Sequence, residues 1–220
     1  VSWAREMCIR DSISAAIGND LTINQINSAG GSDTLTVDFS GGNYTTGGSI
    51  IAPNIETVTL KTTNSGAKTI SGATFTDATS VTITATGSNL IINDLTATNI
   101  TALDASSSNK IVTITTGADV FSSAFTYSGG SSIERLNFDG ATLVVNTVFE
   151  LGRGQDTLTL NADGVATVVR TSATSSGNAF FEREDFFVYC IFTFRLVFFP
   201  CDSYEGPVDT LPKFRQSTLT

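Results

Sequence analysis

The sequence predicts an all-β protein folded as a parallel β-helix (β-solenoid) of about six coils. A short strand pattern centred on one apolar residue recurs, with steps of 23, 23, 22, 33 and 22 residues, at Leu35, Val58, Val81, Leu103, Leu136 and Leu158. Between residues 33 and 178, Thr or Ser alternates with Val, Ile or Leu in short bursts, which is the period of a β-strand. Gly, Asn and Asp separate the bursts and favour turns. A period of 22 or 23 residues therefore predicts stacked coils.

The composition excludes several classes of protein. Acidic residues outnumber basic ones by 21 to 12, giving a net charge of −9, so nucleic acid is not an expected partner. The chain has no histidine, which argues against hydrolase triads and zinc enzymes. The only cysteines, Cys8, Cys190 and Cys201, leave the repeat region without a disulfide framework. The acidic excess does suit calcium, which prefers oxygen ligands.

The chain divides into three parts. Residues 1–12 differ from the repeats in composition and resemble translated adapter read-through, which predicts a non-native leader. Residues 13–178 form the repeat array. Residues 179–220 hold nine of the fifteen phenylalanines and are expected to be either a hydrophobic cap or an out-of-frame segment. The apolar stretch 186–199 is shorter than the ~20 residues of a membrane-spanning helix, so no membrane span is expected.

Each repeat contains two or three predicted strands. The first is expected to begin near Leu21. We call each copy of the recurring strand pattern a rung; further short strand patterns between the rungs lie at 49–52, 69–75, 89–95, 110–115, 141–145 and 165–169. Coils that pair at roughly 4.8 Å would make a rod roughly 30 Å long. In the rung at residues 54–60, strict alternation sends Ile55 and Val58 to opposite faces, so burial of both requires a bend near Glu56.

Two other folds fit part of the pattern. A leucine-rich repeat matches the period and the I-x-x-V-x-L shape of residues 55–60, but the asparagine expected after it is displaced and no helical pattern follows. A tandem β-sandwich matches the strand spacing and remains an alternative, since only the 22-residue similarity favours coils.

The best local motif for a site is Gly152-Arg-Gly154-Gln-Asp156, which matches the core of a calcium-binding nonapeptide. Its glycines allow a tight turn and its aspartate supplies a carboxylate, so Gly152, Gly154 and Asp156 are candidate calcium ligands. A degenerate second version lies far away at residues 29–35. A glycine–aspartate turn that only enters a strand is the other interpretation.

Catalysis is not expected from the acidic residues. Five aspartates are expected to cap their own turns, namely Asp94, Asp104, Asp119, Asp139 and Asp163. A glycosidase needs two carboxylates across a groove, and a lyase needs a base beside calcium. Glu56, or Glu134 with Arg135, are candidates, but the array contains no Asp-Asp or Asp-x-Asp cluster. The sequence therefore predicts a protein that is not an enzyme.

The rungs Ile-Glu-Thr-Val-Thr-Leu at 55–60 and Ser-Val-Thr-Ile-Thr at 80–84, with Gly-x-Gly-x-Asp-Thr-Leu at 152–158, resemble the repeat region of bacterial S-layer and adhesin-like proteins of the type I-secreted RTX class. The resemblance covers roughly residues 30–165. It implies a calcium-dependent parallel β-helix that is exported and assembled on the cell surface. This chain lacks tandem nonapeptides and a recognisable export signal.

The expected function is thus a structural or adhesive segment of an extracellular cell-surface protein. Its expected partners are neighbouring coils or subunits of a surface assembly and cell-surface glycan. The alternatives are a carbohydrate-active β-helix enzyme, which predicts an acidic groove on one sheet face, and a phage or viral fibre segment, which predicts a trimer.

Overall fold

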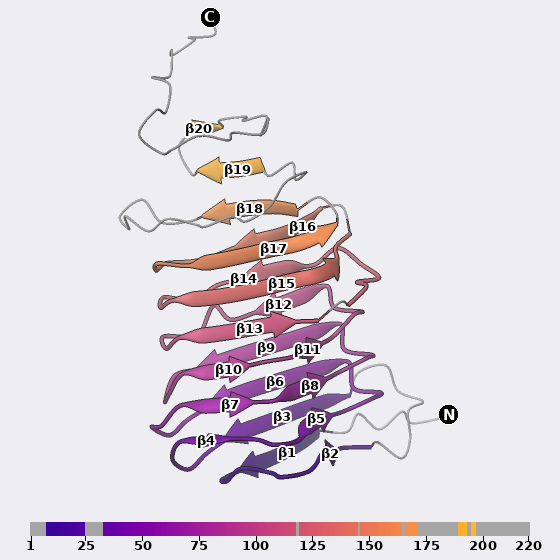
Figure 1. Ribbon diagram of the computed structural model, residues 1–220, viewed down its shortest axis with the longest axis vertical. Helices are drawn as coiled ribbons and strands as arrows, with labels where there is room; N and C mark the ends of the chain where they lie inside the picture. Colours follow the sequence, from indigo (N-terminus) through magenta and orange to yellow (C-terminus); the bar gives the residue numbers. More distant parts are fainter. Residues whose placement is uncertain are drawn as a thin grey trace, which may run out of the picture.

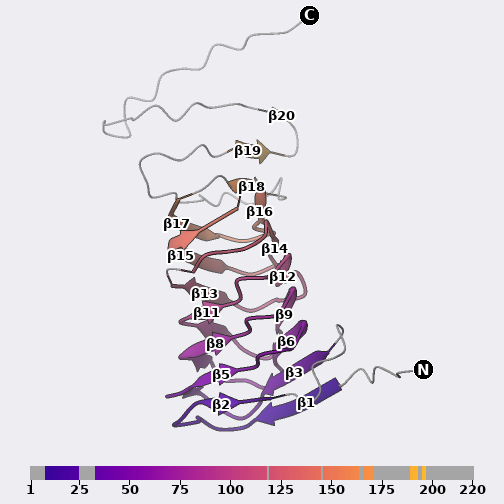
Figure 2. The same ribbon diagram turned by 90° about the vertical axis from the view of Figure 1, so that its right-hand side faces the viewer.

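The chain folds as a β-solenoid of about six turns (Figures 1 and 2). The computed structural model describes residues 8–24, 33–117, 119–144, 146–163, 166–170, 189–192 and 195–196. Every regular element in these segments is a β-strand, and all strand pairs are parallel except β19 with β20. The predicted parallel β-helix is confirmed. The tandem β-sandwich and the leucine-rich repeat are wrong, because the strands are parallel and no helix occurs in the described residues.

Three parallel sheets form the sides of the solenoid. Sheet 1 has ten strands, in the order β1 (Cys8–Ile13), β3 (Thr34–Phe39), β6 (Thr57–Thr62), β9 (Ser80–Ala85), β12 (Ala102–Asp104), β14 (Thr126–Ser128), β16 (Thr147–Glu150), β18 (Ala166–Arg170), β19 (Tyr189–Phe192) and β20 (Arg195–Leu196). Sheet 2 has six strands, β4 (Tyr44–Thr45), β7 (Lys68–Ile70), β10 (Leu90–Ile92), β13 (Val112–Thr116), β15 (Glu134–Thr142) and β17 (Thr157–Asp163). Sheet 3 has four, β2 (Leu21–Thr22), β5 (Ser49–Ile51), β8 (Gly72–Thr74) and β11 (Leu95–Thr96).

The first four predicted rungs stack in register in sheet 1. Leu35 pairs with Val58, Val58 with Val81, and Val81 with Leu103. All four side chains are buried. The 22- or 23-residue period thus measures one full coil.

The 33-residue step between Leu103 and Leu136 does not mark an insertion in one coil, because the two residues lie in different sheets. The residue that stacks on Leu103 in sheet 1 is Tyr127, followed by Phe149. Leu136 belongs to sheet 2, where it pairs with Ile114 and then with Leu158. The 33-residue step exceeds one coil of 22 residues by 11. Eleven residues also separate Leu103 in sheet 1 from Ile114 in sheet 2, which is the length of chain from one side of the coil to the next. The first four apolar residues of the sequence pattern therefore lie in sheet 1, whereas the last two, Leu136 and Leu158, lie in sheet 2.

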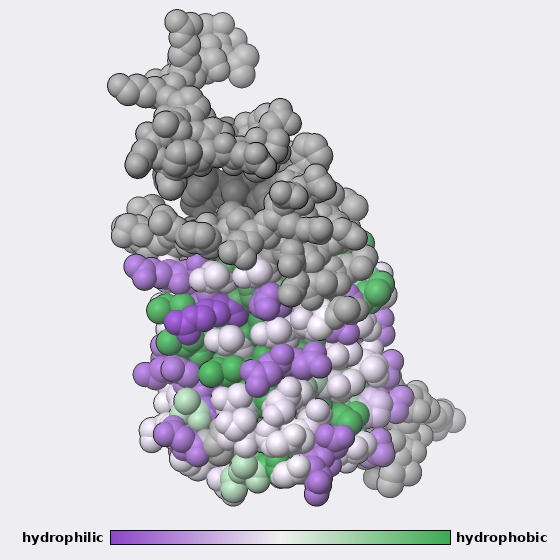
Figure 3. All heavy atoms as spheres, in the orientation of Figure 1, coloured by the Kyte–Doolittle hydropathy of each residue, from purple (hydrophilic) through white to green (hydrophobic). Residues whose placement is uncertain are grey.

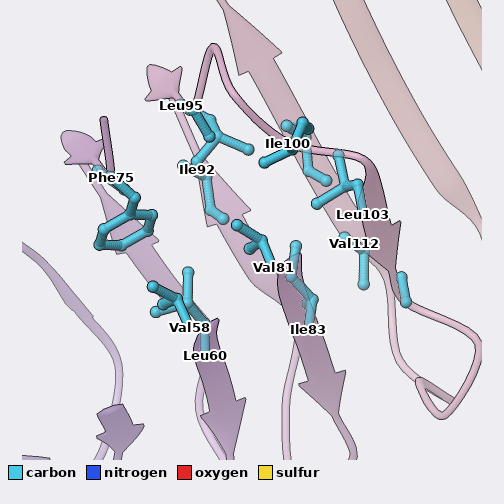
Figure 4. Packing of buried hydrophobic residues seen from close by; sticks show 14 of the residues in the cluster. Val58, Leu60, Phe75, Val81, Ile83, Ile92, Leu95, Ile100, Leu103 and Val112 are labelled. Atoms are coloured by element: carbon cyan, nitrogen blue, oxygen red, sulfur yellow. The ribbon is translucent and has the colours of Figure 1, made fainter. Parts of the chain in front are cut away.

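Strict alternation on the strands builds the core. In β3, β6 and β9 every second side chain is buried and the others are half-buried on the outside. Figure 4 shows the inward side chains of Val58, Val81 and Leu103 on successive strands. Ile55, Val58 and Leu60 are all fully buried, because Ile55 precedes the strand and the chain bends at Glu56. The predicted bend is confirmed.

The core changes shape where sheet 3 ends. Among the described strands, sheet 3 stops at β11, and later coils contribute strands only to sheets 1 and 2. Phe121 and Phe125 follow β13, and their ring centroids are 5.0 Å apart. Phe149 packs edge-on against Phe125 at 5.7 Å and against Phe138 at 5.1 Å. Large aromatic rings therefore fill the volume that side chains of sheet 3 fill in the earlier coils.

The predicted ends of the array lie partly outside the described residues. Residues 8–12 of the predicted leader lie in β1, which pairs with β3 over six residues. In the predicted tail, β19 pairs parallel with β18. The assignments of residues 1–12 and 179–220 as foreign or capping segments stay predictions.

Truncation of Phe149 tests the aromatic cluster. We expect Phe149→Ala to lower the free energy of unfolding by about 3–5 kcal/mol, because it leaves a cavity among Phe125, Tyr127 and Phe138. Val148→Ala on the outer face of the same strand is the control and should change stability by only about 0.5 kcal/mol. Urea unfolding measures both. Equal losses would contradict the assignment of Phe149 to the core.

Candidate functional site

The candidate calcium turn stacks directly on a similar turn of the preceding coil. Residues 151–156 connect β16 to β17, and residues 129–133 connect β14 to β15, whose first residue is Glu134. The Arg153 amide donates a hydrogen bond to the Gly130 carbonyl (2.9 Å). We call these two stacked turns the acidic corner, because a carboxylic acid, Glu134 or Asp156, lies at the end of each.

Both glycines of the motif are required by the close approach of the two turns. Gly152 has φ +68° and Gly154 has φ +150°. A Cβ atom on Gly152 would lie 2.3 Å from the Gly130 carbonyl oxygen, and one on Gly154 would lie 2.0 Å from that of Ser132. Any side chain would therefore push the coils apart.

Asp156 faces the interior rather than the solvent. It occupies the inward position at the beginning of sheet 2, in one column with Glu134. Its side chain is 1% exposed, and its Oδ1 accepts a hydrogen bond from the Glu134 amide (3.1 Å). One function of Asp156 is thus to join the two coils through the backbone.

Glu134 is fully buried beside Asp156. Its Oε1 accepts a hydrogen bond from the Gly130 amide (2.9 Å). Burial raises the pKa of Glu134 to about 9, with a further contribution from its hydrogen bond to the Asp156 carboxyl group. Two carboxylates form such a bond only when one carries a proton, so the neutral acid is the form that the interior favours.

Tyr127 on β14 supplies a third buried oxygen near this pair. Burial raises the pKa of its hydroxyl well above the ordinary value, and the charges of Glu134 and Asp156 raise it further. The Tyr127 hydroxyl, Glu134 Oε2 and Asp156 Oδ2 are all buried without a protein hydrogen-bond partner when both acids are ionised. The two carboxylate oxygens need a proton or a cation in such a place, and the Tyr127 hydroxyl needs an acceptor for its own proton.

The donor set suits a hard cation but is small. Calcium takes 6–8 oxygen ligands, and carboxylate, hydroxyl and carbonyl oxygens are its usual ones. Glu134, Asp156 and Tyr127 offer three side chains, and carbonyls of the glycine turns would have to supply the remainder. Within the described ranges, no three His, Cys, Asp or Glu side chains gather as a metal-binding group.

A cation already occupies the equivalent column near the other end of the solenoid. Lys68 begins β7 and stands in register with Leu90, Val112 and Glu134. Its side chain is fully buried, and its ammonium group donates hydrogen bonds to the carbonyls of Gly41 (3.1 Å), Ser65 (3.2 Å) and Gly66. Burial lowers its pKa. Carbonyls of stacked turns can therefore surround a positive charge in this fold.

The degenerate copy of the motif does not join the acidic corner. Asp33 precedes β3 in sheet 1, whereas Asp156 precedes β17 in sheet 2. The Asp33 amide donates instead to Glu56 Oε2 (2.8 Å), across the turns before β3 and β6. Residues 29–32 of this copy lie outside the described residues, and its aspartate, Asp33, is on a different side of the solenoid from Asp156.

The other acidic candidates lie on separate turns and strands. Glu134 is buried and Arg135 is exposed, so the two side chains lie on opposite faces of sheet 2. Asp104 Oδ1 accepts a hydrogen bond from the Ser106 amide (2.8 Å), which confirms the predicted turn cap. Asp119 lies near Asp94, and burial followed by the Asp94 charge raises its pKa. The side chains of Asp139 and Asp163 lie outside the described ones.

Sequence reasoning missed Glu134 as the partner of Asp156. The signal was present, because Glu134 lies four residues after Gly130 as Asp156 does after Gly152, and the two acids are 22 residues apart. Glu in place of Asp, and Ser132 in place of the second glycine, hid the repeat. Tyr127 carried no local signal.

Comparison of the chain with protein-family models, curated protein sequences and solved structures gives no match in any of the three. Among the described residues, no helix has the length and apolar character needed to cross a membrane.

The pKa of Glu134 predicts a stability that falls as pH rises. Between its ordinary value of 4.5 and about 9, the folded chain holds a proton that the unfolded chain has lost. The free energy of unfolding should therefore fall by up to about 1.4 kcal/mol per pH unit in this window. Urea unfolding between pH 5 and 8, with a chelator present, measures the slope.

Glu134→Gln should remove most of this slope, because the amide is a neutral analogue that keeps an acceptor for the Gly130 amide and a donor for Asp156. The variant should be more stable than the natural chain at pH 8 and similar to it near pH 4.5. Glu150→Gln on the outer face of β16 controls for the lost negative charge. An unchanged slope in Glu134→Gln would show that Glu134 is ionised in the folded protein.

Proposed function

We propose that this chain is a structural or adhesive segment of a secreted bacterial cell-surface protein of the S-layer type, and that it is not an enzyme. The observation that carries the proposal is the continuous parallel stack, in which each coil is bonded to the next along three sides and later two. A stack of this kind forms a rod that can span a distance or bear a load. Its stability is built from contacts between neighbouring coils.

The composition of the outer surface supports the same proposal. Thr and Ser alternate with the core residues on the outside of sheet 1, and the exposed turns hold Asn, Asp and Ser. On the face drawn in Figure 3, pale residues of intermediate hydropathy, the range of Thr, Ser and Gly, are interspersed with hydrophilic and hydrophobic ones. The acids of sheet 1 are also dispersed, since Asp38 pairs with Lys61 (3.5 Å) and Asp104 and Glu150 lie on other strands. A carbohydrate-active enzyme needs paired carboxylates in a groove.

We further propose that calcium binds at the acidic corner. Asp156 and Glu134 would ligate the ion with side-chain oxygens, while Gly152 and Gly154 allow the turn to expose carbonyls. A bound divalent cation would replace the proton between the two acids and join consecutive coils. The caged ammonium of Lys68 supports this arrangement, because it shows carbonyls of the same fold around a positive charge.

Thermal melting tests the calcium proposal. For a dissociation constant of about 10⁻⁴ M, typical of extracellular modules, calcium at about 10 mM should add about 2.7 kcal/mol at neutral pH. The double variant Glu134→Gln with Asp156→Asn should melt at the same temperature with and without calcium. Magnesium is the control ion. An unchanged midpoint for the natural chain would remove the ion from the proposal.

Binding to bacterial envelopes tests the surface function. The purified full chain, with calcium, should sediment with isolated cell envelopes or assemble into ordered sheets or filaments visible by negative-stain electron microscopy. Chelation should release or dissolve it. We expect no reducing sugar or unsaturated product from polysaccharides incubated with the chain.

Three outcomes would contradict the surface proposal. The chain could remain monomeric in solution and unbound to envelopes. It could release sugars, which would favour the carbohydrate-active enzyme. It could form a discrete trimer in analytical ultracentrifugation, which would favour a fibre segment.

A further inference from the structure

The outer face of sheet 1 carries a regular array of hydroxyl side chains. Strands β3 and β6 each present two of them and β9 presents three. We call the six in matching positions the threonine array: Thr34, Thr36, Thr57, Thr59, Ser80 and Thr82. The pairing Thr34–Thr57–Ser80 and Thr36–Thr59–Thr82 runs through both strand pairs without a shift of register. The array therefore repeats at about 4.8 Å across the strands and roughly 6.6 Å along them.

The array is held rigidly from behind. The residues between its members, Leu35, Val58 and Val81, are fully buried or nearly so, as are Val37, Leu60 and Ile83 on the other side of Thr36, Thr59 and Thr82. Five of the six members are threonines, whose β-branched side chains have a restricted χ1 angle, so their methyl and hydroxyl groups keep a fixed arrangement; the sixth, Ser80, carries the hydroxyl alone. A surface of this kind loses little conformational entropy when it binds.

The charge and size of the array restrict its partner. Its six members are neutral, and the adjacent Asp38 and Lys61 neutralise one another in an ion pair. The patch covers on the order of 100 Å², far below the ~800 Å² per partner of a stable protein interface. The array contains no aromatic ring, the group on which sugar rings usually stack. A neutral partner that repeats at the same spacings is the one that fits.

We propose that the threonine array binds the surface of ice. The oxygen atoms of ice form a neutral lattice whose repeats lie in the range of the array, so hydroxyl groups at these positions can continue the lattice. The methyl groups between them order the intervening water. Arg10 on β1 bounds the array on one side, and Ala102 and Asp104 on β12 bound it on the other. The ice-binding face therefore consists of strands β3, β6 and β9 of sheet 1.

Ice-crystal shaping and thermal hysteresis of the purified full chain test this proposal. The natural chain should give faceted crystals and a gap between melting and freezing temperatures. Thr59→Lys, at the centre of the array, should lose most of both effects. Lys61 already points outward from the same strand, so a lysine at position 59 should not prevent folding. Far-ultraviolet circular dichroism and thermal melting check this.

Thr113→Lys is the matched control, because Thr113 is a half-buried residue on the outer face of β13 in sheet 2. It should keep the activity of the natural chain. Rounded crystals without hysteresis for the natural chain would overturn the proposal, and so would equal losses in Thr59→Lys and Thr113→Lys. These assays contain no cell envelope, so their failure leaves the proposed surface function to its own test.

Discussion

The parallel backbone ladder between successive coils is the interaction on which the rest of the structure depends. Each strand bonds to the equivalent strand one coil away, so residues of the same position in successive coils lie directly above one another. Leu35, Val58, Val81 and Leu103 are stacked in this way by sheet 1. The ladder turns a sequence period into columns of side chains, and each column takes the character of its residues.

The same constraint explains why charge can exist inside this core. The column at the beginning of sheet 2 contains Lys68 near one end and Glu134 and Asp156 at the other, with Leu90 and Val112 between them. Each of these ionisable groups lies where a turn brings backbone amides or carbonyls within hydrogen-bonding distance. Burial of these groups is tolerated because the stacked turns provide the partners that water would otherwise supply.

The sequence predicted the features that depend on period and alternation. The solenoid, the first four rungs and the bend at Glu56 followed from them. It did not predict the sheet to which a rung belongs, because Leu136 and Leu103 have the same local pattern on different sides of the coil. The pairing of Glu134 with Asp156 and the position of Tyr127 depend on which turns stack, which is a property of the register. The sequence period also did not predict where sheet 3 ends or that aromatic rings fill the core beyond it, since Phe121 and Phe125 lie in a stretch that interrupts the repeat.

Disulfide trapping in a background with Cys8, Cys190 and Cys201 changed to serine tests the register most directly. Asp104 and Ser128 are neighbours on the outer face of sheet 1, so Asp104→Cys with Ser128→Cys should form a disulfide under mild oxidation. If Leu103 and Leu136 were in adjacent rungs, Asp104 would instead lie beside Asn137. Efficient trapping of the first pair, and none of Asp104→Cys with Asn137→Cys, is the result we expect. The reverse would contradict the arrangement of coils from which the acidic corner and the aromatic cluster follow.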